Sequence, residues 1–272
     1  MGNEEKEINF FQSWCPQHDV LIDIEKKIFS PVVPKSACTL LRHYIYFIDD
    51  SQEHINFKTN HAGQFGIEDA RPILREYPNM EGILFVRDPV ERFLSGFAEV
   101  YYRKTMVEKY GQPNPPGGTV KLKSDFEREL VKNSIEFEHD LLKFLDRSRF
   151  NDLIIYCKAN GRVNVHVEPA TDIIHWTNLK EYDKFTFFEV DKNLYSNVAH
   201  WMRKRGTPLK VEEEVFPNNI TLNGLKGFVK GAISMYISQQ QNGILNDLKQ
   251  YYSKDIEVYE LLKDKFYRGS EQ

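Results

Sequence analysis

The chain has 272 residues, of which 41% are hydrophobic and 28% are charged, and its formal net charge is -4 at pH 7. This is the composition of a folded globular protein, and it excludes a largely disordered chain. A protein with this charge that binds polyanions must gather its basic residues locally. The length allows one large α/β domain or two small ones.

The cysteine content and the chain start exclude further classes. Three cysteines, Cys15, Cys38 and Cys157, cannot all pair within one chain, and their spacing does not resemble a zinc site. We therefore expect neither a disulfide framework nor a bound metal. No apolar run is long enough to span a bilayer, and the first residues lack the apolar core of a signal peptide. By itself the sequence predicts a soluble, cytosolic protein, although Asn219 starts a glycosylation tripeptide that would matter only in a secretory lumen.

The hydrophobic pattern alternates between strand and helix periods from residue 26 onward. A β-branched and aromatic run closed by proline predicts a strand, and apolar residues three and four apart predict a helix. In chain order we expect a strand over 26–33, helices over 39–50 and 66–78, a strand over 82–86, a helix over 89–110, a mobile loop over 111–118, a helical stretch over 124–148, strands over 151–158 and 184–190, a helix over 194–206, and one or two helices from about residue 224.

This alternation predicts an α/β fold with a central, mostly parallel sheet flanked by helices. We expect a single domain over residues 1–272. Within it, residues 1–22 would be a poorly ordered or capping segment.

The stretch VVPKSACTLLRH predicts a sharp turn from a strand into a helix. Such a turn directs several backbone N–H groups and the helix dipole at one point, which favours an anion. Lys35 can reach that anion, and Thr39 can cap the helix or donate its hydroxyl to a phosphate. Between them lie small residues that let the backbone approach a ligand: Ser36, Ala37 and Cys38. The glycines and the residue order of an ATP-binding loop are absent, and a plain strand–helix turn with an exposed lysine is the alternative.

The stretch FVRDPVERFLSGF places polar residues after a second buried strand. Arg87 comes at the carboxyl end of that strand, where open α/β sheets bind ligands. It offers a planar fork for a phosphate, and Ser95, two turns along the next helix, offers a hydroxyl to the same group. The alternative is structural, because Arg92 could pair with Glu91 or Asp88.

These two stretches, in this order, resemble the two nucleotide-binding signatures of sulfotransferases. Their form is that of the Golgi carbohydrate sulfotransferases related to the chondroitin 4-O-, dermatan 4-O- and HNK-1 enzymes. The resemblance implies a sulfotransferase fold like that of P-loop NTPases, with 3′-phosphoadenosine 5′-phosphosulfate (PAPS) as co-substrate and no metal. The first signature, which would hold the 5′-phosphosulfate, comprises Pro34, Lys35, Ser36, Ala37, Cys38, Thr39 and Leu40. The second signature would hold the 3′-phosphate with Arg87, Asp88, Arg92 and Ser95, of which Arg87 and Ser95 are the direct ligands.

Weaker similarity extends over about two thirds of the chain. HVEPA at residues 166–170 is similar to the family's HWRPQ segment, and residues 248–262 are similar to its C-terminal Tyr-x-x-Asp element. The family's cysteines near HWRPQ and its membrane anchor have no counterpart in this sequence. The resemblance nevertheless implies a chondroitin-like glycan as acceptor and the Golgi lumen as location.

The implied reaction is sulfonyl transfer to a sugar hydroxyl. Lys35 is the expected donor to the bridging oxygen of the leaving phosphate. A base must take the hydroxyl proton; His61, between the signatures, is the first choice, and Glu99, one turn past Ser95, is the second. Residues expected to contact the acceptor are Arg103, Lys104, His166 and Glu168. A further basic cluster at residues 203–210 is interpreted as a solvated helix end, which helix electrostatics alone would favour.

Two other functions remain open from the sequence. One is an inactive relative that binds nucleotide or glycan without turnover, which the eroded acceptor-side motifs would suit. The other is a P-loop kinase or NTPase, although the sequence shows no obvious carboxylate pair for Mg²⁺.

Overall fold

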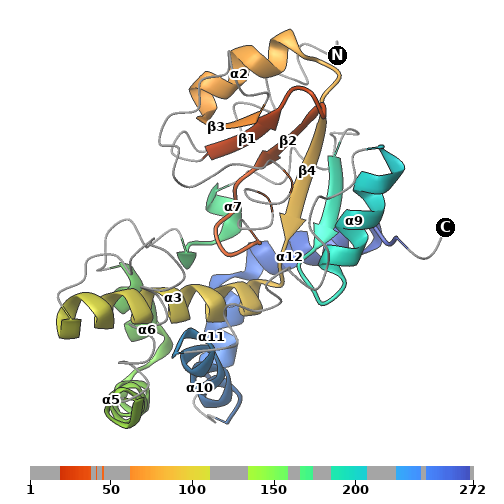
Figure 1. Cartoon of the computed structure of the whole chain (residues 1–272). Helices are drawn as coiled ribbons and strands as arrows, with labels where there is room; N and C mark the ends of the chain where they lie inside the picture. The colour runs from red at the N-terminus through yellow and green to blue at the C-terminus, as the bar shows by residue number, and fades with distance from the viewer. Residues whose placement is uncertain are drawn as a thin grey trace. The chain divides into compact units, whose positions relative to one another are not determined.

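The computed structural model describes residues 19–37, 41, 45, 62–110, 134–158, 166–173, 185–206, 225–239 and 243–269. These residues belong to two compact units. The first comes from residues 1–89, 169–216 and 254–272, and the second from residues 90–168 and 217–253. The first unit contains the sheet and the second is helical (Figure 1).

A five-stranded sheet with the order β3-β1-β2-β4-β5 forms the centre of the first unit (Figure 1). Its strands are β1 (Asp19–Asp23), β2 (Ile28–Pro31), β3 (Ala62–Gly66), β4 (Glu81–Val86) and β5 (Phe185–Glu189). β2, β4 and β5 are parallel, whereas β1 is antiparallel to both β2 and β3. Among the described strands the pairings are thus evenly divided, and the prediction of a mostly parallel sheet is wrong for the N-terminal half.

The strand β1 was not predicted, and its first four residues lie in the segment expected to be poorly ordered or capping. Val20, Leu21 and Ile22 are fully buried, because β1 lies between β2 and β3. The β1–β2 hairpin turns at residues 24–27, where Lys27 adopts a φ of 55°. Turns of this kind usually carry glycine or asparagine at such a position. A lysine there gives no hairpin signal in the sequence.

Both faces of the sheet are buried, which is why its parallel strands read as continuous apolar runs. One face packs on α2 (Ile67–Glu76) and α12 (Ser253–Leu262), through residues that include Leu74 and Tyr259. The other face packs on α9 (Leu194–Lys204), through residues that include Val198 and Trp201. Two short helical pieces, α7 (Ala170–Ile173) and the 3-10 helix η4 (Lys263–Lys265), also belong to this unit.

The second unit packs its helices around aromatic side chains. Most of α3 (Pro89–Tyr110) lies in it, together with α5 (Ser134–Arg147), α6 (Phe150–Lys158), α10 (Leu225–Gln239) and α11 (Ile244–Tyr251). Ring centroids of Phe97 on α3 lie 6.4 Å from Phe144 on α5 and 6.1 Å from Tyr156 on α6. Because aromatic rings bury large areas, this cluster joins three helices.

Residues 151–158 form the helix α6, so the strand predicted there is wrong. Short apolar runs do not distinguish a strand from a buried helix. At the start of the helix the Asp152 carboxylate accepts the Arg149 amide over 2.7 Å, and the Leu153 amide donates the first helical hydrogen bond to the Arg149 carbonyl. Ile155 is 64% exposed while Leu153, Ile154 and Cys157 are buried, which is a helical period.

The other predicted elements within the described residues are confirmed. The strands over 26–33, 82–86 and 184–190 correspond to β2, β4 and β5, and the helices over 66–78, 89–110 and 194–206 to α2, α3 and α9. Gly206, with a φ of 73°, follows the end of α9. The helix over 39–50, the loop over 111–118 and the start of the stretch over 124–148 lie almost entirely outside the described residues.

Candidate nucleotide and acceptor site

The first signature follows β2 as a loop in which the sign of φ alternates. Lys35 has a φ of 65° and Ala37 a φ of 55°, whereas Pro34 and Ser36 stay in the negative range. The Ser36 amide donates to the Val33 carbonyl over 3.1 Å and the Leu41 amide to the Ala37 carbonyl over 3.2 Å. Such alternation turns successive N–H groups toward one side and makes a concavity that suits an anion. The loop therefore attains without glycine a shape that usually needs it, at a cost of about 1–3 kcal/mol for each strained residue.

Arg87 joins the second signature to this loop within the first unit. It follows β4, whose parallel neighbour β2 leads into the loop. The Arg87 Nη1 atom donates a hydrogen bond to the Lys35 carbonyl over 3.0 Å. Residues 52 positions apart in the sequence are thus in contact. The structure therefore brings Arg87 and Lys35, one residue from each stretch, into contact, whereas their nucleotide-binding roles remain a prediction.

Two second-signature residues of α3, Arg92 and Ser95, and the candidate base Glu99 lie in the second unit and are buried. Arg92 is 1% exposed, and Ser95 and Glu99 are each 5% exposed. Arg92 Nη1 donates to the backbone carbonyl of Glu168. Glu91, one of its two predicted alternative partners, forms an ion pair with Lys230, with Nζ and Oε2 2.6 Å apart. Arg92 therefore has a structural contact in addition to the nucleotide role predicted for it, which remains a prediction.

The segment His166–Glu168 is held by its carbonyl groups. The His166 carbonyl lies against Gly96 of α3, so closely that any side chain at position 96 would overlap it. The Val167 carbonyl accepts a hydrogen bond from the Tyr252 hydroxyl, and the Glu168 carbonyl accepts the one from Arg92. Val167 itself is fully buried, whereas the flanking His166 and Glu168 are partly exposed.

The chain after this segment is fixed within the first unit by Asp255 of α12. Its carboxylate accepts the backbone N–H groups of Ala170 over 2.6 Å and Thr171 over 2.9 Å, and the Thr171 hydroxyl over 2.7 Å. A carboxylate at this place caps the start of α7. Tyr252 and Asp255 are the two named positions of the Tyr-x-x-Asp element. The sequence showed that element but gave no role for it.

Several predicted residues have side chains that the structure does not describe. His61, Cys38, Thr39 and Leu40 lie outside the described residues. Arg103 and Lys104 lie on α3, and only their backbone is described. The roles predicted for these residues stay predictions.

A model of the sulfotransferase family matches residues 18–261. The chain belongs to the sulfotransferase family. The match spans both units and includes every predicted site residue from Pro34 to Glu168. Sulfotransferases generally use PAPS as the sulfonyl donor. Searches of curated proteins and of solved structures gave no significant match.

Among the described side chains, no group of three or more His, Cys, Asp or Glu could hold a metal ion. In the same part of the chain, no helix combines the length and the apolar character needed to cross a membrane.

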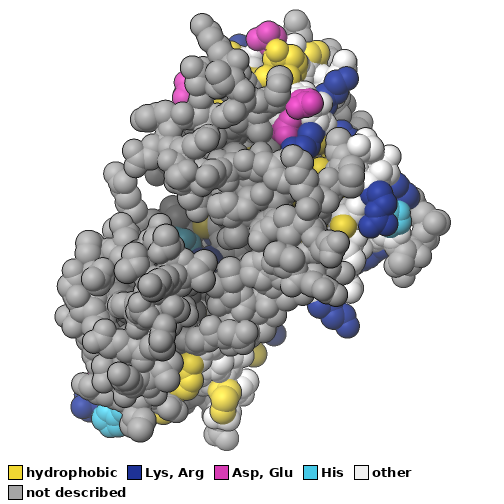
Figure 2. Space-filling view, viewed as in Figure 1, with side chains coloured by type: hydrophobic (Ala, Val, Ile, Leu, Met, Phe, Trp, Pro, Cys, Tyr) yellow, Lys and Arg dark blue, Asp and Glu magenta, His cyan; other side chains and the backbone are white. Residues whose placement is uncertain are grey.

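The basic cluster at the end of α9 has structural contacts. Figure 2 shows basic side chains over this helix. Arg205 forms an ion pair with Glu81 of β4, and its guanidinium lies 4.7 Å from the centre of the Trp201 ring. These contacts give Arg205 a structural role, and the interpretation of the rest of the cluster stays a prediction.

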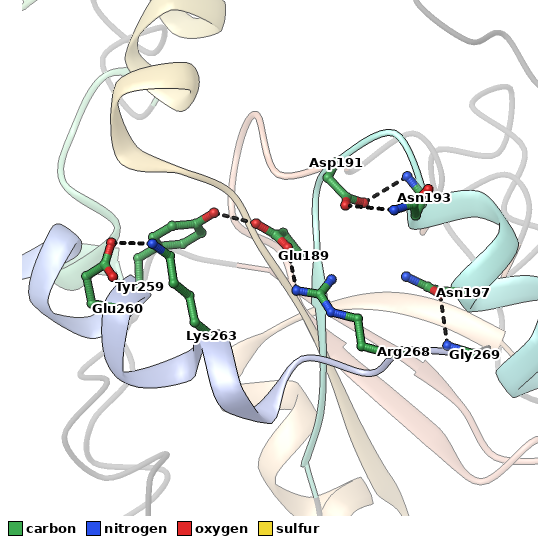
Figure 3. A network of polar contacts seen from close by, with 9 residues as sticks. All are labelled: Glu189, Asp191, Asn193, Asn197, Tyr259, Glu260, Lys263, Arg268 and Gly269. Atoms are coloured by element: carbon green, nitrogen blue, oxygen red, sulfur yellow. Dashed lines mark hydrogen bonds and ion pairs between the residues drawn. The ribbon is translucent and has the colours of Figure 1, made fainter. Parts of the chain in front are cut away.

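A polar network lies at the end of β5, beside the strand end from which Arg87 follows (Figure 3). The Glu189 carboxylate accepts a hydrogen bond from the Tyr259 hydroxyl, and it pairs with Arg268 with Nη2 and Oε2 2.8 Å apart. Burial raises the pKa of Glu189, but the hydrogen bonds from Tyr259 and Arg268 and the charges of Arg268 and Lys263 outweigh it, so the pKa is lowered overall. Burial and the hydrogen bond to Glu189 raise the pKa of Tyr259.

The lowered pKa of Glu189 predicts a stability that depends on pH. The stabilisation is present above the ordinary pKa of 4.5 and is lost as the pH falls through the lower value of the folded state. Glu189→Gln should reduce the free energy of unfolding by about 1 kcal/mol at neutral pH, and by less at acid pH. Urea unfolding of the wild type and of Glu189→Gln, at neutral and at acid pH, measures the difference in their free energies of unfolding. Glu260→Gln, which breaks an exposed pair with Lys263, is the matched control and should have little effect. A difference that grows as the pH falls would contradict the prediction.

Proposed function

We propose that this sulfotransferase moves a sulfonyl group from PAPS to a hydroxyl group of a chondroitin-like glycan. Family membership supports sulfonyl transfer in general. The observation that carries the nucleotide assignment is the hydrogen bond from Arg87 to the Lys35 carbonyl, which joins the two signatures. The similarity of both signatures to those of the Golgi enzymes supports the carbohydrate acceptor. It also supports the Golgi lumen as location, where the glycosylation tripeptide at Asn219 would be used.

The first signature would bind the 5′-phosphosulfate of the donor. The positive φ values of Lys35 and Ala37 support this role, because alternation of the sign of φ is typical of backbone turns that bind anions. The residues assigned to it are Pro34, Lys35, Ser36, Ala37, Cys38, Thr39 and Leu40. Arg87 and Ser95 would bind the 3′-phosphate, since a guanidinium fork and a hydroxyl both donate to phosphate oxygens.

The reaction is an in-line displacement at sulfur. The acceptor hydroxyl oxygen forms a bond to sulfur while the bond between sulfur and the bridging phosphate oxygen breaks, and adenosine 3′,5′-bisphosphate leaves. Negative charge grows on the bridging oxygen, where the Lys35 ammonium would stabilise it. The hydroxyl proton passes to a base, for which His61 is the first candidate and Glu99 the second.

The test is transfer of sulfate from PAPS to chondroitin by the wild type and by Lys35→Ala. We expect the variant to lose about 100-fold or more in kcat, as removal of one donor to a developing oxyanion usually does. Lys27→Ala is the control, because Lys27 is also a lysine at positive φ, 55°, but lies in the β1–β2 turn. It should retain the wild-type rate.

Other outcomes distinguish the alternatives. Binding of adenosine 3′,5′-bisphosphate without transfer to any glycan would indicate an inactive relative. Mg²⁺-dependent binding of ATP that is tighter than binding of the bisphosphate would indicate a kinase or NTPase. Equal rates for the wild type and Lys35→Ala would reject the assigned role of this lysine.

A further inference from the structure

We infer that Tyr252 and Asp255 are positioning residues for the acceptor, because they fix the segment 166–171 that carries His166 and Glu168. This inference rests on the proposed function. Neither residue was among the site residues predicted from the sequence, and neither would touch the reacting atoms.

The segment 166–171 is held by side chains at both its carbonyl and its amide groups. Side chains from elsewhere in the chain engage the Val167 and Glu168 carbonyls and the Ala170 and Thr171 amides. Tyr252 is fully buried and Asp255 is 5% exposed. In regular structure such groups are satisfied by neighbouring backbone, whereas here buried side chains satisfy them. The path of the segment therefore depends on these few side chains.

The segment presents two polar side chains, those of His166 and Glu168. The one side chain that lies between His166 and Glu168, that of Val167, is fully buried, and both neighbours are partly exposed. The backbone is fixed between these two polar side chains, at Val167, and after them, at Ala170 and Thr171, which limits where the two side chains can reach. Functional groups are held in a productive position by this kind of supporting contact. Displacement of about 1 Å is enough to lower a rate by about 100-fold.

Two conservative variants distinguish a positioning role from ordinary packing. Tyr252→Phe removes one hydroxyl and keeps the ring, whose centroid lies 6.0 Å from that of Phe93 and 4.9 Å from that of Tyr251. Asp255→Asn keeps the shape of the side chain but replaces one acceptor oxygen with a donor. Neither variant changes the signatures. We therefore expect an effect on the acceptor and not on the nucleotide.

The chain offers matched controls in the second unit. The Tyr236 hydroxyl donates to the Ser148 carbonyl over 2.9 Å, so Tyr236→Phe removes the same kind of bond at a different place. Asp152 caps α6 by accepting the Arg149 amide, so Asp152→Asn removes a comparable carboxylate cap. Any general loss of stability caused by such changes should appear in the controls as well.

The experiment measures PAPS-dependent transfer to chondroitin in the full chain, together with binding of adenosine 3′,5′-bisphosphate. Tyr252→Phe and Asp255→Asn should raise the KM for chondroitin by about tenfold or more, with the nucleotide Kd unchanged. They should also speed hydrogen exchange of the amides in 166–171, which the controls should not do. An unchanged KM for chondroitin, or a parallel loss of nucleotide binding, would overturn the inference. Absence of transfer by the wild type would instead overturn the proposed function, on which the inference depends.

Discussion

Replacing Arg87 with alanine is expected to weaken the binding of adenosine 3′,5′-bisphosphate by about 100-fold or more. Two losses contribute to this effect. The variant removes the guanidinium fork proposed to bind the 3′-phosphate, and it removes the hydrogen bond from Nη1 to the Lys35 carbonyl. Because Lys35 and Ala37 are both held at positive φ, the loop is expected to relax once that bond is gone. Isothermal titration of the nucleotide into the purified variant measures the change.

Arg87→Lys separates the two contributions. A lysine keeps the positive charge but cannot donate in two fixed directions, so binding should be intermediate, about tenfold weaker than in the wild type. Arg75→Ala is the control, since Arg75 is an exposed arginine in the last turn of α2. Wild-type affinity in Arg87→Ala would contradict both the ligand role and the loop-holding role of this residue.

The place of Arg87 could be predicted from the sequence, whereas its contact with the loop could not. The apolar run before Arg87 predicts a parallel strand, and the carboxyl end of such a strand is where α/β sheets bind ligands. That reasoning needs only periodicity and position. The contact with Lys35 depends on β2 and β4 being neighbours in the sheet, and strand order is not encoded in the local pattern of either strand.

The errors in predicting β1 and α6 have causes in the local sequence. β1 and its turn lack the usual turn residues, because Lys27 occupies the left-handed position. The helix α6 was predicted as a strand because its apolar run is only a few residues long. The role of Arg92 was incompletely predicted for a different reason. Its contact with Glu168 joins residues 76 positions apart, and the sequence offered nearer carboxylates as partners.

Gly96→Ala is expected to destabilise the protein by about 3 kcal/mol, although alanine is the better helix former. An added Cβ would overlap the His166 carbonyl oxygen and lie 2.8 Å from its carbonyl carbon and 3.0 Å from a methyl group of Val167. The obstacle is backbone that Tyr252 and Arg92 hold in place on the two following residues. It therefore cannot move aside as the end of a flexible side chain could.

A glycine-to-alanine substitution at Gly231 should instead increase the free energy of unfolding. Gly231 lies within α10, and a Cβ there would meet no atom within 4 Å. With no overlap to oppose it, Gly231→Ala should stabilise the protein by about 0.5–1 kcal/mol, the difference in helix propensity between the two residues. Urea unfolding of the two variants and the wild type measures whether each substitution lowers or raises the free energy of unfolding. If Gly96→Ala were as stable as Gly231→Ala, the segment 166–168 could not be packed against α3 as closely as the structure has it, and the rigid support proposed for His166 and Glu168 would be absent.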